Sequence, residues 1–212
     1  KLSNSFRPEA VPRREFQVAQ SVASLGLRTP AVRRLVTEGS RIGVEFDRVK
    51  NKRSYARAIS QEPGKLEEYS REFARLCKQL HSIKCDTKVF KPARMRFQRA
   101  IVDAKGYSDE QKKKMLSFID SVPLVETCIH GDMHIGNVLM ADGKNYWIDL
   151  SDFGYDDPLF DLGMFYMTSY GLMDNDLSLQ LFHITIEQQC KVWDVFADEY
   201  YDHKYTREEI HE

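Results

Sequence analysis

The chain has 212 residues, of which 42% are hydrophobic and 30% charged, a mixture that excludes a disordered or fibrous protein. Its length allows one large domain or two small lobes. The 31 basic and 32 acidic residues leave a net charge of -1, which argues against a nucleic-acid-binding protein, and no apolar run is long enough for a membrane span.

The charge is distributed unevenly along the chain. Residues 1–60 carry 13 basic and 5 acidic side chains, a balance of +8, and the remainder has a balance of -9. Such asymmetry is typical of separate sites for anionic and cationic ligands, and it fits solvated faces equally well.

The cysteines and the start of the chain bear on its location. The four cysteines form no CxxC pair and no metal-finger spacing, which favours reduced thiols in a cytoplasmic protein. The sequence opens at Lys1 with no signal peptide and no Met, so we expect the natural N-terminus to lie upstream.

The first quarter of the chain predicts a helix and then a hairpin. Residues 12–25 carry apolar side chains at helical spacing. Residues 31–37 and 41–49 are β-branched and alternating, and the Glu-Gly-Ser sequence between them predicts the turn of a hairpin. Polar residues replace the strand pattern at residues 50–53, where we expect a flexible joint.

The middle of the chain predicts three helices. In residues 65–83, six apolar side chains recur at alternating steps of three and four, which is typical of a helix with one buried face. Residues 92–104 and 108–121 also have a helical pattern. Ser108 followed by Gln111 has the form of a capping box at the start of the last helix.

The last third predicts a short β-insert and a helical tail. Strands are expected at residues 125–129, 137–140 and 145–150, with an Ala-Asp-Gly-Lys turn between the last two. Residues 158–201 are predicted to be mostly helical. None of this periodicity identifies a function.

The segment from His130 to Asn137 groups the polar residues that phosphoryl transfer requires. It reads His-Gly-Asp-Met-His-Ile-Gly-Asn, with the carboxylate of Asp132 on a loop and the amide of Asn137 five residues later. A second carboxylate, Asp149, ends the next strand. One carboxylate can orient and deprotonate an attacking hydroxyl, while an amide oxygen and another carboxylate can hold Mg²⁺ on nucleotide phosphates.

These residues resemble the aminoglycoside phosphotransferase and choline kinase-like superfamily, whose members typically read His-Gly-Asp-x-His-x-Gly-Asn. Residues 148–163 read Ile-Asp-Leu-Ser-Asp-Phe-Gly-Tyr-Asp-Asp-Pro-Leu-Phe-Asp-Leu-Gly, which is similar to the family's Ile-Asp…Gly-x-x-Asp-Pro…Asp-Leu block. The two blocks at this spacing are a specific signal, and the similarity covers nearly the whole chain.

The resemblance implies an α+β, protein-kinase-like fold of two lobes. Residues 1–50 would be the remainder of a β-containing nucleotide-binding lobe, and residues 51–212 a helical C-terminal lobe that carries the catalytic loop and the metal-binding strand and loop. The glycine-rich loop that covers the phosphates would precede Lys1, so we expect the N-terminal lobe to be truncated in this sequence.

The resemblance also implies roles for the residues of the two blocks. Asp132 would be the catalytic base, and Asn137 and Asp149 would bind Mg²⁺. Asp152 opens an Asp-Phe-Gly sequence that protein kinases use for magnesium, but Asp149 follows the strand directly and is the favoured ligand. Asp161 is expected to brace the catalytic loop.

Three residues upstream complete the nucleotide site that the resemblance implies. Lys1 would contact the nucleotide phosphates and Glu15 would be its ion-pair partner. The hinge strand near Glu45–Arg48 would present backbone groups to the nucleobase. Taken alone, Glu15 also fits a first-turn acid that favours the helix dipole.

The resemblance therefore implies an ATP-dependent kinase that uses Mg²⁺ and transfers the γ-phosphoryl group to a hydroxyl of a small molecule, with no nucleic-acid or membrane partner. An anionic cleft would favour a cationic acceptor such as an aminoglycoside, choline or a related amine. Its candidate residues are Asp152, Asp156, Asp157, Asp174 and Asp176. The same acids fit loop caps and exposed charge, and sugars, homoserine-like amino acids and protein hydroxyls stay open as acceptors.

Two other interpretations remain. His130, Asp132 and His134 have a spacing that suits a zinc or di-metal hydrolase, although no further His or Cys lies at useful spacing. A non-catalytic module that keeps the kinase-like scaffold to bind a partner is the third interpretation. The intact Asp132, Asn137 and Asp149 argue against it.

Overall fold

The computed structural model describes residues 10–171 and 174–211. Its strands are β1 (Val32–Glu38), β2 (Arg41–Phe46), β3 (Arg53–Ser54), β4 (Cys128–Ile129), β5 (Val138–Ala141), β6 (Lys144–Trp147) and β7 (Gly154–Tyr155). Its helices are α1 (Ala10–Ser24), α2 (Tyr55–Gln61), α3 (Leu66–His81), α4 (Arg94–Asp103), α5 (Asp109–Ser121), α6 (Leu159–Tyr166), α7 (Asn175–Phe182), α8 (Ile186–Tyr200) and α9 (Arg207–His211). Shorter turns are η1 (Pro63–Lys65), η2 (Leu150–Asp152) and the π-helical η3 (Met167–Gly171).

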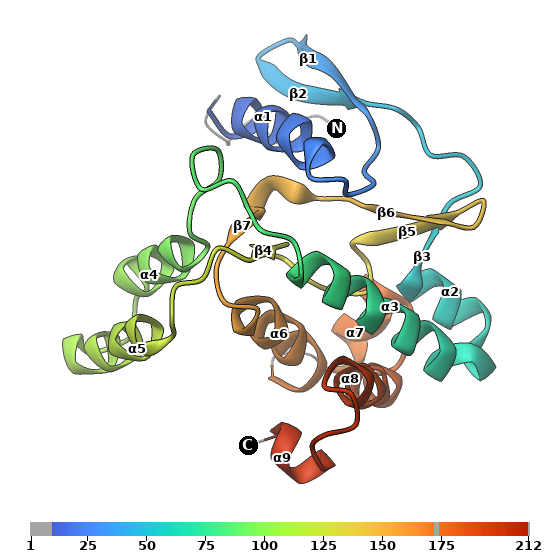
Figure 1. Ribbon diagram of the computed structural model, residues 1–212, viewed down its shortest axis with the longest axis vertical. Coiled ribbons are helices and arrows are strands. Elements are labelled where there is room, and N and C mark those ends of the chain that lie inside the picture. Colours follow the sequence, from blue (N-terminus) through green and yellow to red (C-terminus); the bar gives the residue numbers. More distant parts are fainter. Residues whose placement is uncertain (1–9, 172–173, 212) are drawn as a thin grey trace.

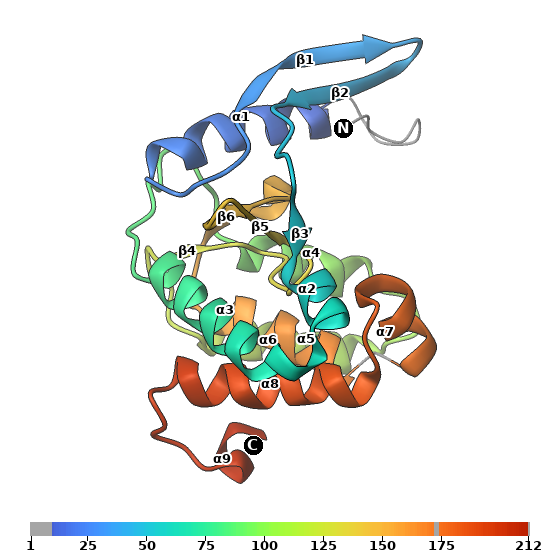
Figure 2. The same cartoon turned by 90° about the vertical axis from the view of Figure 1, so that its right-hand side faces the viewer.

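Helix α1 and the β1–β2 hairpin lie together at one end of the molecule, and helices α3, α6 and α8 lie beyond the small sheets at the other (Figures 1 and 2). The hairpin is antiparallel and pairs Val36 with Gly43. Its exposed face carries cross-strand ion pairs, such as Arg34 with Glu45 at 2.6 Å. The predicted helix and hairpin are confirmed, with the second strand ending at Phe46.

Three short strands, in the order β3-β5-β6, lie between the two ends. Strands β5 and β6 are joined by a tight turn in which Asp142 and Gly143 have φ values of 51° and 68°. Two left-handed residues make the type I′ geometry that matches the twist of a hairpin, which is why Asp-Gly occupies this position. Strands β4 and β7 form a separate antiparallel pair.

The core of the helical part forms around Phe73 of α3. Its ring lies 5.5 Å from that of Phe165 on α6 and 5.6 Å from that of Phe196 on α8, and all three side chains are fully buried. Helices α3 and α8 pack along one another (Figure 2). Aromatic pairs at these separations favour edge-on and tilted contacts, which fix the angles between the helices.

The predicted helices at residues 65–83, 92–104 and 108–121 are confirmed as α3, α4 and α5, and the capping box of Ser108 and Gln111 is present. The strand predicted over residues 125–129 is shorter, because only Cys128 and Ile129 pair with β7.

Two helices were not predicted. Helix α2 follows the expected joint directly, with Ser54 as its N-cap, and α9 lies at the opposite end of the molecule from the hairpin (Figure 1). Both are too short to show a clear helical period. The described residues form no helix that is both long and apolar enough to cross a bilayer. The division into lobes after residue 50 stays a prediction.

Candidate active site

The catalytic loop predicted at residues 130–137 follows β4 and ends where β5 begins. It turns sharply at Gly131, whose φ is 81°. A Cβ atom there would lie 2.2 Å from the backbone oxygen of Asp152. Only glycine fits, because it adopts this left-handed conformation at low cost and leaves room for the neighbouring backbone.

Asp161 braces the start of this loop. Its carboxylate accepts hydrogen bonds from the backbone amides of His130, at 2.6 Å, and Gly131, at 2.7 Å. The ring Nε2 of His81 lies 3.1 Å from the same carboxylate. Asp161 is fully buried, and burial by itself would raise its pKa, but the contacts with His81 and His130 outweigh burial and lower the pKa below its ordinary value.

The ring of His130 connects the loop to the end of β6. Its Nε2 lies 2.9 Å from the carbonyl oxygen of Ile148, which can only accept, so Nε2 carries the proton. Its Nδ1 accepts a hydrogen bond from the backbone amide of Asp132 at 3.3 Å. A neutral, fully buried imidazole therefore satisfies both ring nitrogens with backbone groups.

Asp132 and Asn137 lie against each other across the loop. The side-chain Nδ2 of Asn137 donates to the backbone carbonyl of Asp132 at 2.8 Å and to its carboxylate at 3.1 Å. Asn137 is buried, whereas the side chain of Asp132 is 41% exposed and so accessible to a substrate. The amide oxygen of Asn137 faces away from the two bonds that its nitrogen makes, as a metal ligand requires.

His134 approaches the same carboxylate oxygen of Asp132 that Asn137 contacts. Its Nδ1 accepts the backbone amide of Gly136 at 3.0 Å, and its Nε2 lies 3.8 Å from the carboxylate of Asp132. Burial lowers the pKa of His134, although the Asp132 charge opposes this shift. His134 is thus neutral at physiological pH and presents an N–H toward Asp132.

Asp149 lies at the end of β6 in a left-handed conformation, with φ 57° and ψ 49°. Its side chain is exposed and lines a cavity of about 250 Å³. Other residues of the lining are Glu15 of α1 and residues 46–49, which are the last residue of β2 and the three that follow it. The structure therefore brings together Asp149 and Glu15, which are far apart in the sequence.

The remaining nucleotide-site residues have different surroundings. Glu15 is buried at 5% exposure on α1 and lines the cavity. Glu45 itself does not line the cavity, and its carboxylate pairs with Arg34, but the next three residues of the expected hinge, Phe46 to Arg48, do line it. Lys1 lies outside the described residues.

Asp152, the alternative magnesium ligand, has a basic partner. Nη1 of Arg96, on α4, lies 3.1 Å from its carboxylate, and Nη2 of the same guanidinium donates to the carbonyl of Gly131. Arg96 therefore fixes η2 against the catalytic loop. The sequence analysis missed this residue because one arginine among several on a helix carries no distinguishing spacing.

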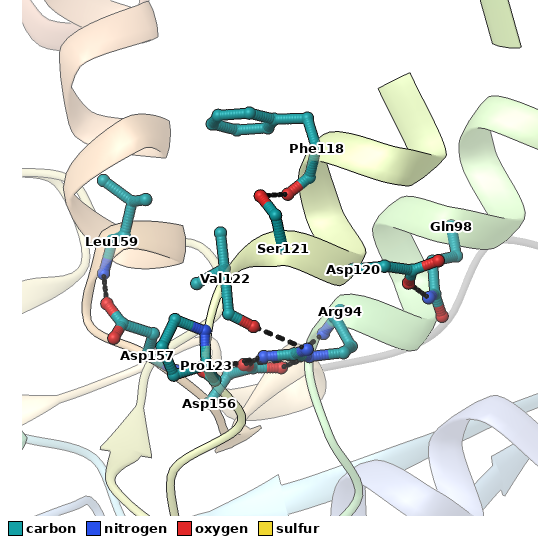
Figure 3. Close-up of polar contacts among 10 residues, drawn as sticks. All are labelled: Arg94, Gln98, Phe118, Asp120, Ser121, Val122, Pro123, Asp156, Asp157 and Leu159. Carbon is teal, nitrogen blue, oxygen red and sulfur yellow. Dashed lines mark hydrogen bonds and ion pairs between the residues drawn. The ribbon is translucent and has the colours of Figure 1, made fainter. Parts of the chain in front are cut away.

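Asp156, which was expected to line an anionic cleft, is fully buried against Arg94. Figure 3 shows the guanidinium of Arg94 between this carboxylate and the carbonyls of Val122 and Pro123, each 3.0 Å away. Asp156 also accepts the backbone amide of Arg94 at 3.0 Å. This carboxylate anchors the start of α4 and is shielded from any acceptor.

Two more of the five acids cap backbone groups. Asp157 accepts the amide of Leu159 at 2.9 Å (Figure 3), and Asp174 accepts the amide of Leu177 as the N-cap of α7. Asp176 is exposed in the first turn of α7. The set is therefore dispersed over several elements, as the alternative interpretation of loop caps and exposed charge predicts.

The geometry does not favour a zinc hydrolase. Within residues 10–171 and 174–211, no three His, Cys, Asp or Glu side chains are placed to hold a metal ion. Both ring nitrogens of His130 and the Nδ1 of His134 are engaged with backbone groups. His130 and His134, two of the three proposed zinc ligands, are therefore oriented by hydrogen bonds to the backbone.

Comparison with known proteins identifies the family and the fold of the chain. A family model described as the phosphotransferase enzyme family matches residues 1–199. Aminoglycoside-3'-phosphotransferase of type VIII has a TM-score of 0.54 and 16% identity, over 90% of this chain and 80% of that one. No curated protein sequence matches the chain.

Two further solved structures contain bound molecules. A thermostable mutant of aminoglycoside phosphotransferase APH(4)-Ia, in ternary complex with ADP and hygromycin B, has a TM-score of 0.55 and 12% identity over 92% of this chain and 80% of that one. The streptomycin–ATP–APH(2")-IIa ternary complex has a TM-score of 0.51 and 18% identity over 93% and 69%. At these identities the likeness shows the fold alone.

The segments that carried the resemblance in the sequence, residues 130–137 and 148–163, lie inside the matched range and form the site described above. The predicted α+β, protein-kinase-like fold is confirmed by the structural matches. The chain belongs to the phosphotransferase enzyme family.

Proposed function

We propose that this protein transfers the γ-phosphoryl group of ATP to a hydroxyl group of a small molecule. The observation that carries the proposal is the pairing of Asp132 and Asn137, which orients a half-exposed carboxylate close to the strand that delivers Asp149. The structural relatives that hold ATP or ADP together with an antibiotic are consistent with such a reaction.

In this proposal Asp132 accepts the proton of the attacking hydroxyl. Its carboxylate oxygen Oδ2 accepts from Asn137 at 3.1 Å and lies 3.8 Å from Nε2 of His134. The other carboxylate oxygen, Oδ1, takes part in neither contact and would meet the acceptor hydroxyl. General-base catalysis by a carboxylate held in this way contributes about 10²–10⁴-fold to the rate.

Asn137 and Asp149 would hold Mg²⁺. Their side chains offer an amide oxygen and a carboxylate, which suit a hard cation that prefers oxygen. The backbone joins them, because the amide of Ile148, next to Asp149, donates to the carbonyl of Asn137 at 3.0 Å. When bound, Mg²⁺ would neutralise charge on the nucleotide phosphates.

The nucleotide itself would occupy the cavity between α1, the segment after β2, and β6. Glu15 on its wall would pair with Lys1, which would contact the phosphates, and the backbone near Glu45 would meet the nucleobase. The cavity volume of about 250 Å³ is close to the lower end of the range for small-molecule sites.

The test is an ADP-release assay over a panel of amines, sugars and antibiotics. Asp132→Asn should lower turnover about 10²–10⁴-fold while the thermal shift caused by Mg-ATP persists. Asp142→Asn, which removes the same charge from the exposed β5–β6 turn, is the matched control. Equal turnover in Asp132→Asn and wild type would refute the assignment.

A further inference from the structure

A second cavity, of about 500 Å³, is lined in part by η2, as is the proposed nucleotide cavity. Its walls come from the beginning of α1, from the segment that leads into α4, from α4 itself and from residues 151–153. Four basic side chains line it, and we refer to it as the basic pocket. They are Arg14, Lys91, Arg96 and Arg99.

The basic pocket adjoins the catalytic loop. Its Arg96 donates to the carbonyl of Gly131, the residue directly before Asp132. Its Asp152 has a backbone oxygen so close to Gly131 that no Cβ would fit between them. A molecule in the pocket therefore lies beside the loop that carries the proposed base.

Two elements, helix α1 and the chain from Asp149 to Phe153, contribute residues to both cavities. Helix α1 presents the buried Glu15 to the nucleotide cavity and the exposed Arg14 to the basic pocket. The chain from Asp149 to Phe153 contributes Asp149 to the first and Asp152 to the second. A nucleotide in one cavity and a second ligand in the other would thus be neighbours.

The charge in the basic pocket is strongly positive. Among the described residues that line it, Asp152 is the one acid, and it pairs with Arg96. Arg99 lies 3.6 Å from Asp103, but both side chains are mostly exposed, so this pair neutralises little. Among the described residues, neither Arg14 nor Lys91 is within ion-pair distance of a carboxylate.

We propose that the basic pocket binds an anionic group, a carboxylate or a phosphate, of the phosphoryl acceptor. The inference rests on the proposed function and narrows its substrate class to acidic hydroxyl compounds. Convergent guanidinium and ammonium groups attract such an anion and repel a polycationic amine. The five acids that would have favoured a cationic acceptor are dispersed over several elements and form no anionic cleft. Their placement therefore agrees with an acidic acceptor.

The first test compares matched acceptors in the presence of saturating Mg-ATP. A neutral hexose, its amino sugar, its uronic acid and its phosphate ester differ mainly in charge. We expect kcat/KM to be at least about tenfold higher for the two acids, since each charge-assisted hydrogen bond contributes about 1.5–3 kcal/mol. Phosphorylation of the amino sugar in preference to the acids would overturn the inference and leave the proposed function standing.

The second test uses variants of the exposed pocket residues. Arg14→Gln and Lys91→Gln should each raise the KM for the acidic acceptor about tenfold and leave the KM for Mg-ATP unchanged. Lys113→Gln, on the exposed face of α5, removes the same charge outside the pocket and should change neither value. An increase confined to the KM for Mg-ATP would instead assign the pocket to the nucleotide phosphates and overturn the inference.

A binding experiment separates failure of the inference from failure of the proposed function. Inorganic phosphate, titrated into the full chain and followed by NMR, should bind in wild type and lose about tenfold in affinity in Lys91→Gln. Binding without phosphorylation of any hydroxyl compound would refute the proposed function but support an anion site. No binding by wild type, or equal binding by the variant, would refute the inference.

Discussion

Asn137 donates the two hydrogen bonds of its side-chain amide to a single residue, Asp132, reaching the backbone carbonyl at 2.8 Å and the carboxylate at 3.1 Å. One amide thus sets both the loop conformation and the direction of the proposed base. Its oxygen remains on the opposite side, so the same residue can serve a metal ion.

This relationship predicts the effect of Asn137→Asp. The substitution keeps the shape but replaces the donor with a second carboxylate against Asp132, and two like charges at this separation cannot both ionise easily. We expect kcat to fall about 100-fold or more, as when one positioned donor is removed from an active site. Asn175→Asp, at the exposed start of α7, is the control, because Asn175 uses only its oxygen, as an acceptor for the amide of Ile186. Retention of wild-type kcat by Asn137→Asp would contradict the role assigned to the amide.

The two candidate magnesium ligands are distinguished by their neighbours. Asp149→Asn should raise the Mg²⁺ concentration needed for half-maximal activity at least about 10–100-fold, a loss typical even of residues that only orient a metal ligand. Asp152→Asn should leave that concentration nearly unchanged, because its carboxylate pairs with Arg96. Magnesium titrations of the two variants decide between the two carboxylates. A larger increase in the required Mg²⁺ concentration for Asp152→Asn than for Asp149→Asn would make Asp152 the ligand.

Gly131 is predicted to be irreplaceable for steric reasons. In Gly131→Ala the new Cβ meets the backbone oxygen of Asp152 at 2.2 Å, so either the loop or η2 must shift. Gly106→Ala is a matched control, because Gly106 has a similar φ of 85° but no atom within 4 Å of the added carbon. Both variants incur the left-handed strain, about 1–3 kcal/mol in unfolding free energy.

We expect Gly131→Ala to be measurably less stable than Gly106→Ala in urea unfolding, and to lose activity that Gly106→Ala retains. Equal stability of the two variants, with full activity in both, would contradict this prediction. It would show that the backbone near Asp152 can shift to admit the added carbon without loss of stability or activity.

Asp161 should stabilise the fold in a pH-dependent manner. Its carboxylate has two acceptor oxygens for the donors of His81, His130 and Gly131, whereas the amide of Asp161→Asn offers one. Breaking a buried, charged contact of this kind costs about 3–5 kcal/mol near neutral pH. Urea unfolding of the two proteins measures the difference.

The pKa of Asp161 determines the direction of the pH effect. Because folding lowers this pKa, the stabilisation is fully present above the unfolded value of about 3.9 and is lost as the pH falls through the lower native value. The difference between wild type and Asp161→Asn should therefore shrink below about pH 4. A difference that stays constant down to pH 2 would mean that Asp161 acts through packing and not through its charge.

The sequence by itself determined the family, most of the helices, the hairpin and the loop of residues 130–137. These are local properties: α3 and α5 follow from periodicity and capping, and residues 130–137 form the loop through a short polar motif whose partners are five residues apart. Such signals depend on residues that are neighbours along the chain, so they can be recognised without knowledge of the fold.

Only the tertiary structure decided which charged residues have partners. Asp156 and Asp152 look alike in the sequence, yet one is fully buried against Arg94 and the other contacts Arg96 at a cavity wall. The basic pocket joins residues of α1, α4 and η2 that lie far apart in the sequence, such as Arg14, Arg96 and Asp152. Ion pairing and burial are long-range properties, and a pattern of charges along the chain does not encode them.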